Sequence, residues 1–360
     1  MPGDPQIILD AHEDIAANTL LFGRDFTESA YAKRKREAVN PPPNLWGTAI
    51  TGLPDALLGR VGIIFGTLFV APAWAAMGGE RGYETSAEAY KMALDQIDVY
   101  NRLAETNERI VLVRTQGELE SVLATWAEGV EFEAHKLGLV ISIEGADSIP
   151  EPQAFEEWYE RGVRAVGLAW SETRYSGGTR RPGPLTGPGR ELLEVMESLN
   201  AILDVSHMTD ESFYQAVERY SGPVIASHSN PRKFCDTERH LSDDMIRRLA
   251  ERGGVMGIVP YNAFLKNGYV SGEKKAKTPL SVVVAAIDHV CQVTGSAQHV
   301  GIGSDFDGGF GAESIPAELD TVADLSLIGK ALAGHGYNAA DISGIMSGNF
   351  LRVLRASLPR

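Results

Sequence analysis

Side chains capable of metal binding or acid–base chemistry stand directly after short apolar runs at five places in the chain. Three histidines and three carboxylates share this position: His12 and Asp14, Glu144, His207, His228, and Asp305. Neutral imidazoles combined with carboxylates suit Zn²⁺, and Mn²⁺ and Fe²⁺ also accept such donors. One such residue alone is more often structural or a helix cap. Because the pattern recurs, we interpret the set as one metal centre.

The spacing within this set indicates two ions. His12 and Asp14 are two residues apart, so both side chains point to one side of an extended segment and can bind one ion. His207 and His228 follow successive apolar runs and can share a second ion. Glu144, with two carboxylate oxygens, is expected to bridge the two ions.

The chemistry expected of such a centre is hydrolysis of an amide bond. Two ions about 3.5–4 Å apart would hold a bridging hydroxide at neutral pH and polarise a neighbouring carbonyl group. Asp305 is then the remaining carboxylate. It can take the proton from the water and pass it to a leaving amine.

The scaffold that must position these residues is predicted from alternating runs. Eight short apolar runs are separated by longer helix-like segments: Ile7–Asp10, Val61–Val70, Leu139–Ile143, Arg164–Leu168, Ala201–Val205, Val224–Ser227, Gly254–Val259 and Val300–Gly303. Alternating strands and helices predict a parallel sheet, and eight units favour a closed (β/α)8 TIM barrel of the α/β class. An open doubly wound sheet is the alternative, and Ile110–Val113 is a ninth run outside the count.

Helices and loops are expected between the strands. The clearest helical segments are Ala87–Glu105, Glu191–Leu199, Asp243–Arg252 and Leu280–Val293. Asn40–Pro54 and Ser176–Gly189 are rich in glycine and proline, which predicts long loops after strands, over the active-site end of the barrel. The basic cluster at residues 33–36 is expected to be a solvated helix face.

Composition narrows the class of protein. The chain has 360 residues with 44% hydrophobic and 22% charged residues, which is ordinary globular composition, and we expect one domain over residues 1–360. The formal net charge of −15 disfavours nucleic acid and anionic membranes as partners. Two cysteines cannot form a cysteine-based zinc module.

Val61–Met77 is uncharged but contains glycine and proline, so a buried strand with a turn is favoured over a membrane span. With no signal peptide recognised, a cytoplasmic location is expected.

Several motifs together resemble one known family, the membrane (renal) dipeptidases, which are the M19 metallopeptidases of the amidohydrolase superfamily. The resemblance covers almost the whole chain and rests on residues 10–14 (DAHED), 143–145 (IEG), 204–207 (DVSH), 226–229 (ASHS), 238–240 (ERH) and 303–308 (GSDFDG). It implies a (β/α)8 barrel, a binuclear zinc centre with a bridging carboxylate, and hydrolysis of dipeptides, including some with a C-terminal D-residue. Homodimers are frequent in the family.

The resemblance also implies roles for single residues. It agrees with the metal ligands His12, Asp14, Glu144, His207 and His228 inferred above. Asp305 resembles the family's acid/base, which also holds the substrate amino group. Arg239 resembles the residue that binds the dipeptide carboxylate, and Tyr261 resembles a second substrate contact.

Trp170 departs from the family pattern. It stands where the family has a histidine that helps to bind the substrate and stabilise the oxyanion. An indole N–H can donate a hydrogen bond but can neither accept one nor carry charge. The sequence therefore predicts a zinc-dependent dipeptidase, with a related amidohydrolase acting on an N-acyl amino acid or lactam as the alternative. A non-catalytic binding protein is disfavoured, because all five expected ligands and Asp305 are present.

Overall fold

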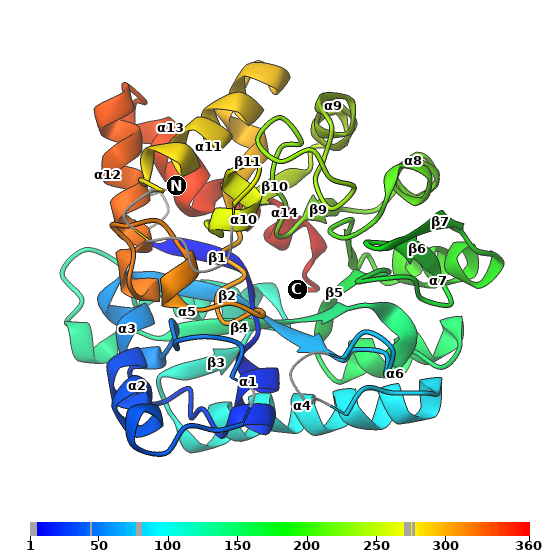
Figure 1. Ribbon diagram of the computed structural model, residues 1–360, viewed down its shortest axis with the longest axis horizontal. Coiled ribbons are helices and arrows are strands. Elements are labelled where there is room, and N and C mark those ends of the chain that lie inside the picture. Colours follow the sequence, from blue (N-terminus) through cyan, green and yellow to red (C-terminus); the bar gives the residue numbers. More distant parts are fainter. Residues whose placement is uncertain (1–5, 44, 77–80, 270–274, 276–277) are drawn as a thin grey trace.

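Eight parallel strands form a closed barrel in the computed structural model, which describes residues 6–43, 45–76, 81–269, 275 and 278–360 (Figure 1). The strands are β1 (Ile8–Glu13), β2 (Val61–Phe69), β4 (Leu137–Glu144), β5 (Val163–Gly167), β8 (Ile202–Asp204), β9 (Val224–Ala226), β10 (Val255–Ile258) and β11 (Val300–Ile302). They pair in the order β2-β1-β11-β10-β9-β8-β5-β4, and pairing of β4 with β2 closes the ring. The predicted (β/α)8 barrel is confirmed, and each barrel strand overlaps one of the eight predicted runs.

The ninth predicted run is strand β3 (Ile110–Leu112), which extends the sheet outside the ring. It pairs with Leu137–Leu139 at the start of β4. Strand β5 pairs with β4 only from Ile141 onward. One edge of β4 is therefore shared by β3 and β5. For this reason the sequence contains nine apolar runs although the barrel has eight strands.

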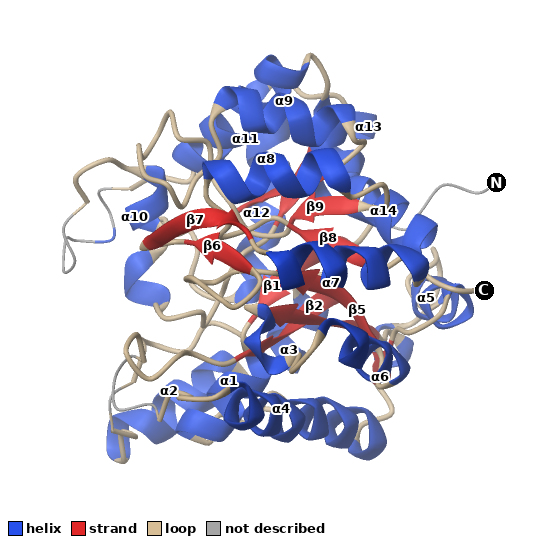
Figure 2. Ribbon diagram, turned by 90° about the vertical axis from the view of Figure 1, so that its right-hand side faces the viewer, coloured by secondary structure: helices blue, strands red, loops and turns tan. Residues whose placement is uncertain are grey.

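Helices surround the barrel strands (Figure 2). Those among the described residues are α1 (Ile15–Phe22), α2 (Ala30–Val39), α3 (Leu53–Leu58), α4 (Ser86–Thr106), α5 (Gln116–Ala124), α6 (Phe155–Glu160), α7 (Gly187–Ser198), α8 (Asp210–Arg219), α9 (Asp243–Glu251), α10 (Asn262–Leu265), α11 (Ser281–Thr294), α12 (Ser326–His335), α13 (Ala339–Ser343) and α14 (Asn349–Ser357). The longest, α4, begins at a capping box of Thr85 and Glu88 and buries Ala93, Ile97 and Tyr100. The four predicted helical segments correspond to α4, α7, α9 and α11.

The barrel strands have the burial expected of a parallel sheet covered on both faces. Every residue of β2 and β4 is buried, so their apolar runs show no alternation. The uncharged run that begins at Val61 is thus strand β2 for its first nine residues. Among the helices that the structure describes, none is long and apolar enough to cross a membrane.

The predicted loop at Ser176–Gly189 is wrong in part, because it contains a β-hairpin. Strands β6 (Ser176–Gly178) and β7 (Arg181–Leu185) pair antiparallel, and α7 begins at Gly187. Prolines are tolerated in β7 because an edge strand can leave N–H positions unpaired. Figure 2 shows this hairpin and α10 toward one end of the barrel, with the C-terminus toward the other.

Asn40–Pro54 also differs from the prediction, since it follows helix α2 rather than a strand and runs into α3. It folds back on the preceding helix and buries Lys33, which was expected to be solvated. The Nζ of Lys33 donates to the carbonyl oxygen of Thr51 at 2.9 Å and lies 5.7 Å from the ring centre of Phe26. Burial of a lysine is costly unless the ammonium group has an acceptor, which Thr51 supplies here.

Candidate metal centre

The barrel brings all the predicted metal-centre residues to the carboxyl ends of its strands. His12 lies in β1 and Glu144 ends β4. His207, His228 and Asp305 follow β8, β9 and β11 within three residues. His12, Asp14, Glu144, His207 and His228 are buried, and the Asp305 side chain is 13% exposed. In such barrels this end carries the chemistry.

Two of these residues have a strained backbone. His207 has φ of 65° and Asp305 has φ of 56°, both in the left-handed region. A residue with a Cβ atom adopts this conformation at a cost of about 1–2 kcal/mol. Such strain is typical of functional sites, where the surrounding structure holds a side chain in a required direction.

Glu144 lies between the histidines. Its Oε1 is 2.9 Å from His207 Nε2 and 3.2 Å from His228 Nε2, while Oε2 is 3.4 Å from His12 Nε2. The two imidazoles that share Oε1 have their Nε2 atoms 3.1 Å apart. The two carboxylate oxygens therefore face different histidines, as a bridging ligand requires.

A second group of donors lies on the other side of Glu144. His12 Nε2 is 3.7 Å from Asp14 Oδ2 and 3.9 Å from Asp305 Oδ1. The donor atoms of this group, like those of Glu144, His207 and His228, lie within 4.8 Å of one another. Each group can hold one cation, and Asp305 is close enough to contact the ion beside His12.

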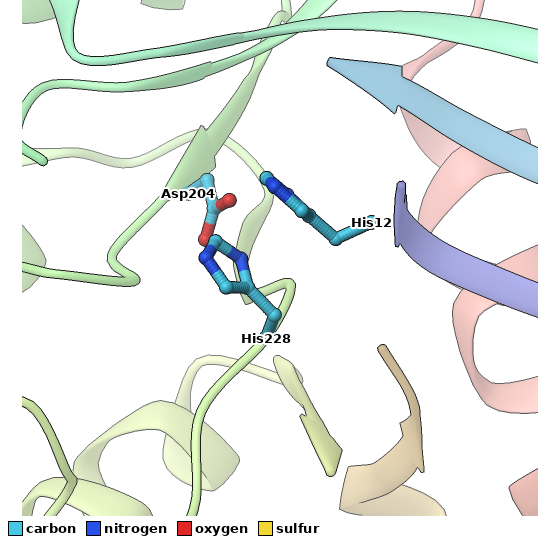
Figure 3. Close-up of side chains that lie close together, drawn as sticks. All are labelled: His12, Asp204 and His228. Atoms are coloured by element: carbon cyan, nitrogen blue, oxygen red, sulfur yellow. The ribbon is translucent and has the colours of Figure 1, made fainter. Parts of the chain in front are cut away.

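Asp204 is a functional residue for which the sequence analysis gave no role. Figure 3 shows it beside His12 and His228, and the three also form a possible ligand group. Its Oδ1 accepts hydrogen bonds from the backbone N–H groups of Ser206 (3.0 Å) and Ser227 (2.9 Å), and its Oδ2 accepts from the Ser227 hydroxyl. These bonds occupy both oxygens, so we interpret Asp204 as a positioning residue.

The bonds of Asp204 fix the tautomer of His228. Because the Ser227 hydroxyl donates to a carboxylate, its oxygen must accept from His228 Nδ1, 2.7 Å away. The proton of the neutral ring is then on Nδ1, and Nε2 faces Glu144 with a free lone pair. Orientation of an imidazole through its second nitrogen is usual for metal ligands.

The electrostatics of the cluster favour a cation. Burial, followed by the charge of Arg239, lowers the pKa of His207 to about 4, and this ring is neutral near pH 7. Burial raises the pKa of Asp14, whose Oδ1 has no hydrogen-bond partner among the described residues. Burial alone would lower the pKa of His12, but Glu144 and Asp14 outweigh it and raise the value. The neutral ring of His207 suits a metal ion, and the carboxylates that raise the pKa of His12 favour positive charge at that position, which a divalent ion can supply in place of the proton.

A cavity of about 340 Å³ opens over the cluster and is lined by the three predicted substrate-binding residues, Arg239, Tyr261 and Trp170. Arg239 is buried and donates to Ser229 Oγ at 3.0 Å and to the carbonyl oxygen of His228 at 2.7 Å. Its Nε has no hydrogen-bond partner in the described part of the chain. The guanidinium is thus held in place, and the second N–H of each terminal nitrogen remains for a ligand.

Aromatic rings form two walls of this cavity. On one side Tyr261 stacks on Phe310, with ring centres 4.2 Å apart. On the other side Trp170 lies 5.1 Å from the ring of Phe69 and 6.4 Å from that of His207. Trp170 therefore contacts the cavity beside a predicted metal ligand, as its place in the sequence implied.

Comparison with known proteins identifies the family. The family model for membrane dipeptidases, peptidase family M19, matches residues 6–358. The chain belongs to this family. Membership places it among hydrolases that act on peptide bonds and implies a divalent metal ion, for which the two donor groups provide ligands.

Relatives of this M19 family member include named dipeptidases. Dipeptidase 3 of Mus musculus is 30% identical over 279 residues, which cover 74% of this chain and 52% of the mouse protein. An uncharacterized protein in the pqqA 5′ region of Klebsiella pneumoniae is 34% identical over 229 residues, covering 61% of this chain and 82% of that protein. The chain thus spans about half the length of the mouse relative.

Solved structures share the fold of this M19 family member. A metallopeptidase from Rhodobacter sphaeroides, liganded with a phosphinate mimic of the dipeptide L-Ala-D-Ala, superposes with a TM-score of 0.79 at 22% identity, covering 98% of this chain and 100% of that one. A dipeptidase of family M19 gives a TM-score of 0.79 at 23% identity, covering 99% of this chain and 100% of that one. The barrel of this chain therefore has the same fold as these two structures over nearly its whole length.

Proposed function

We propose that this protein is a zinc-dependent dipeptidase with two ions, one beside His12 and Asp14 and the other beside His207 and His228. The observation that carries the proposal is the position of Glu144, whose two oxygens face the two donor groups. When bound, the ions would supply an activated water and polarise the scissile carbonyl. Zn²⁺ is the first choice for this donor set, and Mn²⁺ or Fe²⁺ also suit it.

Arg239 binds the C-terminal carboxylate of the dipeptide in this proposal. Two of its nitrogens are held by Ser229 and by the backbone of His228, which fixes the plane of the guanidinium. A planar carboxylate can then accept hydrogen bonds from the remaining N–H groups without reordering the side chain. Tyr261 and Trp170 enclose the substrate from the two aromatic walls.

Asp305 moves the proton. It lies on the β11 side of the cluster, near His12, where the amino end of a substrate held by Arg239 would lie. Burial, with further contributions from Asp14 and Glu144, raises the pKa of Asp305 well above its ordinary value. A carboxyl group of this kind can accept a proton from the attacking water and release it to the departing amine.

Trp170 favours a second candidate within the same reaction class. An indole ring in place of an imidazole gives the cavity a more apolar wall, which suits the acyl group of an N-acyl amino acid or the ring of a lactam. The metal-centre residues and Asp305 would have the same roles with these substrates. The difference would lie on the carbonyl side of the scissile bond, where these compounds carry no free α-amino group.

A substrate panel separates the two candidates. We expect the zinc-loaded protein to hydrolyse L-X–L-Y or L-X–D-Y dipeptides, measured by release of the free amino acids, and to leave matched N-acyl amino acids uncleaved. Cleavage of the N-acyl compounds alone would replace the dipeptidase by the second candidate. Cleavage of neither, with two ions bound, would reject both substrate classes.

Other features belong to the same proposal. A small dipeptide is the expected partner, with no nucleic acid and no membrane. A single domain over residues 1–360, a homodimer and a cytoplasmic location stay predictions.

A further inference from the structure

Two arginines line the cavity of this acidic protein, and only Arg239 has a role in the proposed function. Arg239 is buried near the cluster, whereas Arg180 is exposed at the rim. Within the described residues, no carboxylate oxygen lies at ion-pair distance from the guanidinium of either arginine. The cavity therefore presents two cationic groups, of which Arg239 also feels the charges of Asp305 and Glu144 and Arg180 lies farther out at the rim.

The hairpin fixes Arg180 at this rim. Gly178 pairs with Arg181, which leaves Thr179 and Arg180 as a two-residue turn. The backbone N–H of Arg180 donates to Glu238 Oε1 at 2.9 Å, and that of Thr179 donates to the carbonyl oxygen of His207 at 2.9 Å. The turn is thereby tied to the residue before Arg239 and to a predicted metal ligand.

The backbone of Arg180 is strained in a way that glycine would avoid. Its φ is 70°, in the left-handed region that hairpin turns normally fill with glycine or asparagine. Its guanidinium lies over the indole of Trp170, 5.4 Å from the ring centre, so the side chain is directed along the cavity wall. The strained backbone conformation would favour glycine at this position. An arginine here therefore indicates a functional role for its side chain.

The position of Arg180 assigns it to one end of the substrate. Arg180 belongs to the β5–β8 connection and Arg239 to the β9–α9 connection, whereas Asp305 follows β11. In the barrel order, β8 and β9 are neighbours and β10 separates them from β11. The two arginines therefore lie on the carboxylate side of the proposed substrate, away from the end at which Asp305 meets the amine.

We propose that the preferred substrates are dipeptides whose C-terminal residue has an acidic side chain. Arg239 binds the α-carboxylate, and Arg180 binds the side-chain carboxylate at the rim. This inference rests on the proposed dipeptidase function. A C-terminal glutamine has the same shape as glutamate but leaves the charge of Arg180 without a partner.

The test compares Ala-Glu with Ala-Gln, each with an L- or D-residue at the C-terminus, on the zinc-loaded protein. We expect kcat/KM to be ~10-fold higher for the preferred Ala-Glu isomer than for its Ala-Gln counterpart, as one charge-assisted contact allows. In Arg180→Gly the ratio should fall to about one, while Arg180→Lys, which keeps the charge but not the planar guanidinium, should retain part of it. Glycine suits φ of 70°, so this variant relieves strain. Because the ratio compares two substrates of one variant, a general loss of activity cancels.

Arg181 provides the matched control on the same hairpin. It is exposed, lies 3.7 Å from the ring centre of Trp74, pairs with Glu172 at 3.2 Å, and is not among the residues that line the cavity. Arg181→Gln removes the same charge and should keep the wild-type ratio. An equal loss in both variants would overturn the role of Arg180, because it would show a general effect of surface charge.

Calorimetric binding separates this inference from the proposed function. Cleavage of both dipeptides with a ratio near one would reject the role of Arg180 and keep the dipeptidase. Absence of cleavage, with Ala-Glu bound ~10-fold more tightly than Ala-Gln in an Arg180-dependent manner, would reject the dipeptidase and keep the site for a dicarboxylate. Equal binding without cleavage would reject both.

Discussion

Replacing Asp305 by asparagine is expected to lower kcat by about 10³-fold, because asparagine cannot accept and return the proton. Asparagine keeps the side-chain shape and one oxygen toward the His12 group, so both zinc ions should be retained. The measurement is the steady-state rate on the best dipeptide, with zinc counted by elemental analysis of the same sample.

Asp236→Asn is the matched control for this change. Asp236 is exposed in the connection between β9 and α9, so the same substitution there should leave kcat unchanged. Full activity in Asp305→Asn would remove Asp305 as the proton carrier. Loss of zinc together with activity would instead make it chiefly a ligand, which its 3.9 Å distance to His12 Nε2 also permits.

Replacing Glu144 by glutamine is expected to reduce the zinc content from two ions per chain to about one and to lower kcat by about 10³-fold. An amide has one acceptor oxygen and no charge, so it cannot serve both donor groups. His12, His207 and His228 are unchanged in this variant, which removes only the carboxylate that faces all three of them. Elemental analysis and the dipeptide assay on one preparation give both values.

Glu13→Gln tests whether loss of any buried carboxylate would have this effect. Burial, followed by the charges of Asp10 and Asp307, raises the pKa of Glu13 well above its ordinary value. Glutamine keeps the shape of this side chain and cannot carry a negative charge. Glu13 is completely buried next to His12 in the sequence but is absent from the donor groups. This variant should keep two zinc ions, and a loss equal to that of Glu144→Gln would remove the special role of Glu144.

The metal-centre residues could be predicted because side chains that can bind metal stand at the ends of predicted parallel strands. Each stands where an apolar run stops, and parallel strands bring such ends to one side of the barrel. The sequence therefore predicted both the barrel and the convergence of His12, Glu144 and His228 on one site, although these residues are far apart in the chain.

Other parts of the site depend on contacts that no local pattern indicates. Asp204 is a polar residue in a short strand, and its role depends on Ser227, which lies on the neighbouring strand end. The turn at Arg180 lies in a segment whose glycines and prolines are typical of loops, and its paired strands are only three and five residues long. The burial of Lys33 depends on the path of a later loop. These features follow from tertiary packing rather than periodicity.

The most direct test of the binuclear dipeptidase is a zinc titration of the metal-free protein in which dipeptide hydrolysis is followed at each addition. The rate is expected to reach its plateau at two zinc ions per chain, because Glu144 faces two donor groups that act together. A plateau at one ion per chain, or two bound ions with no cleavage of any dipeptide, would contradict it.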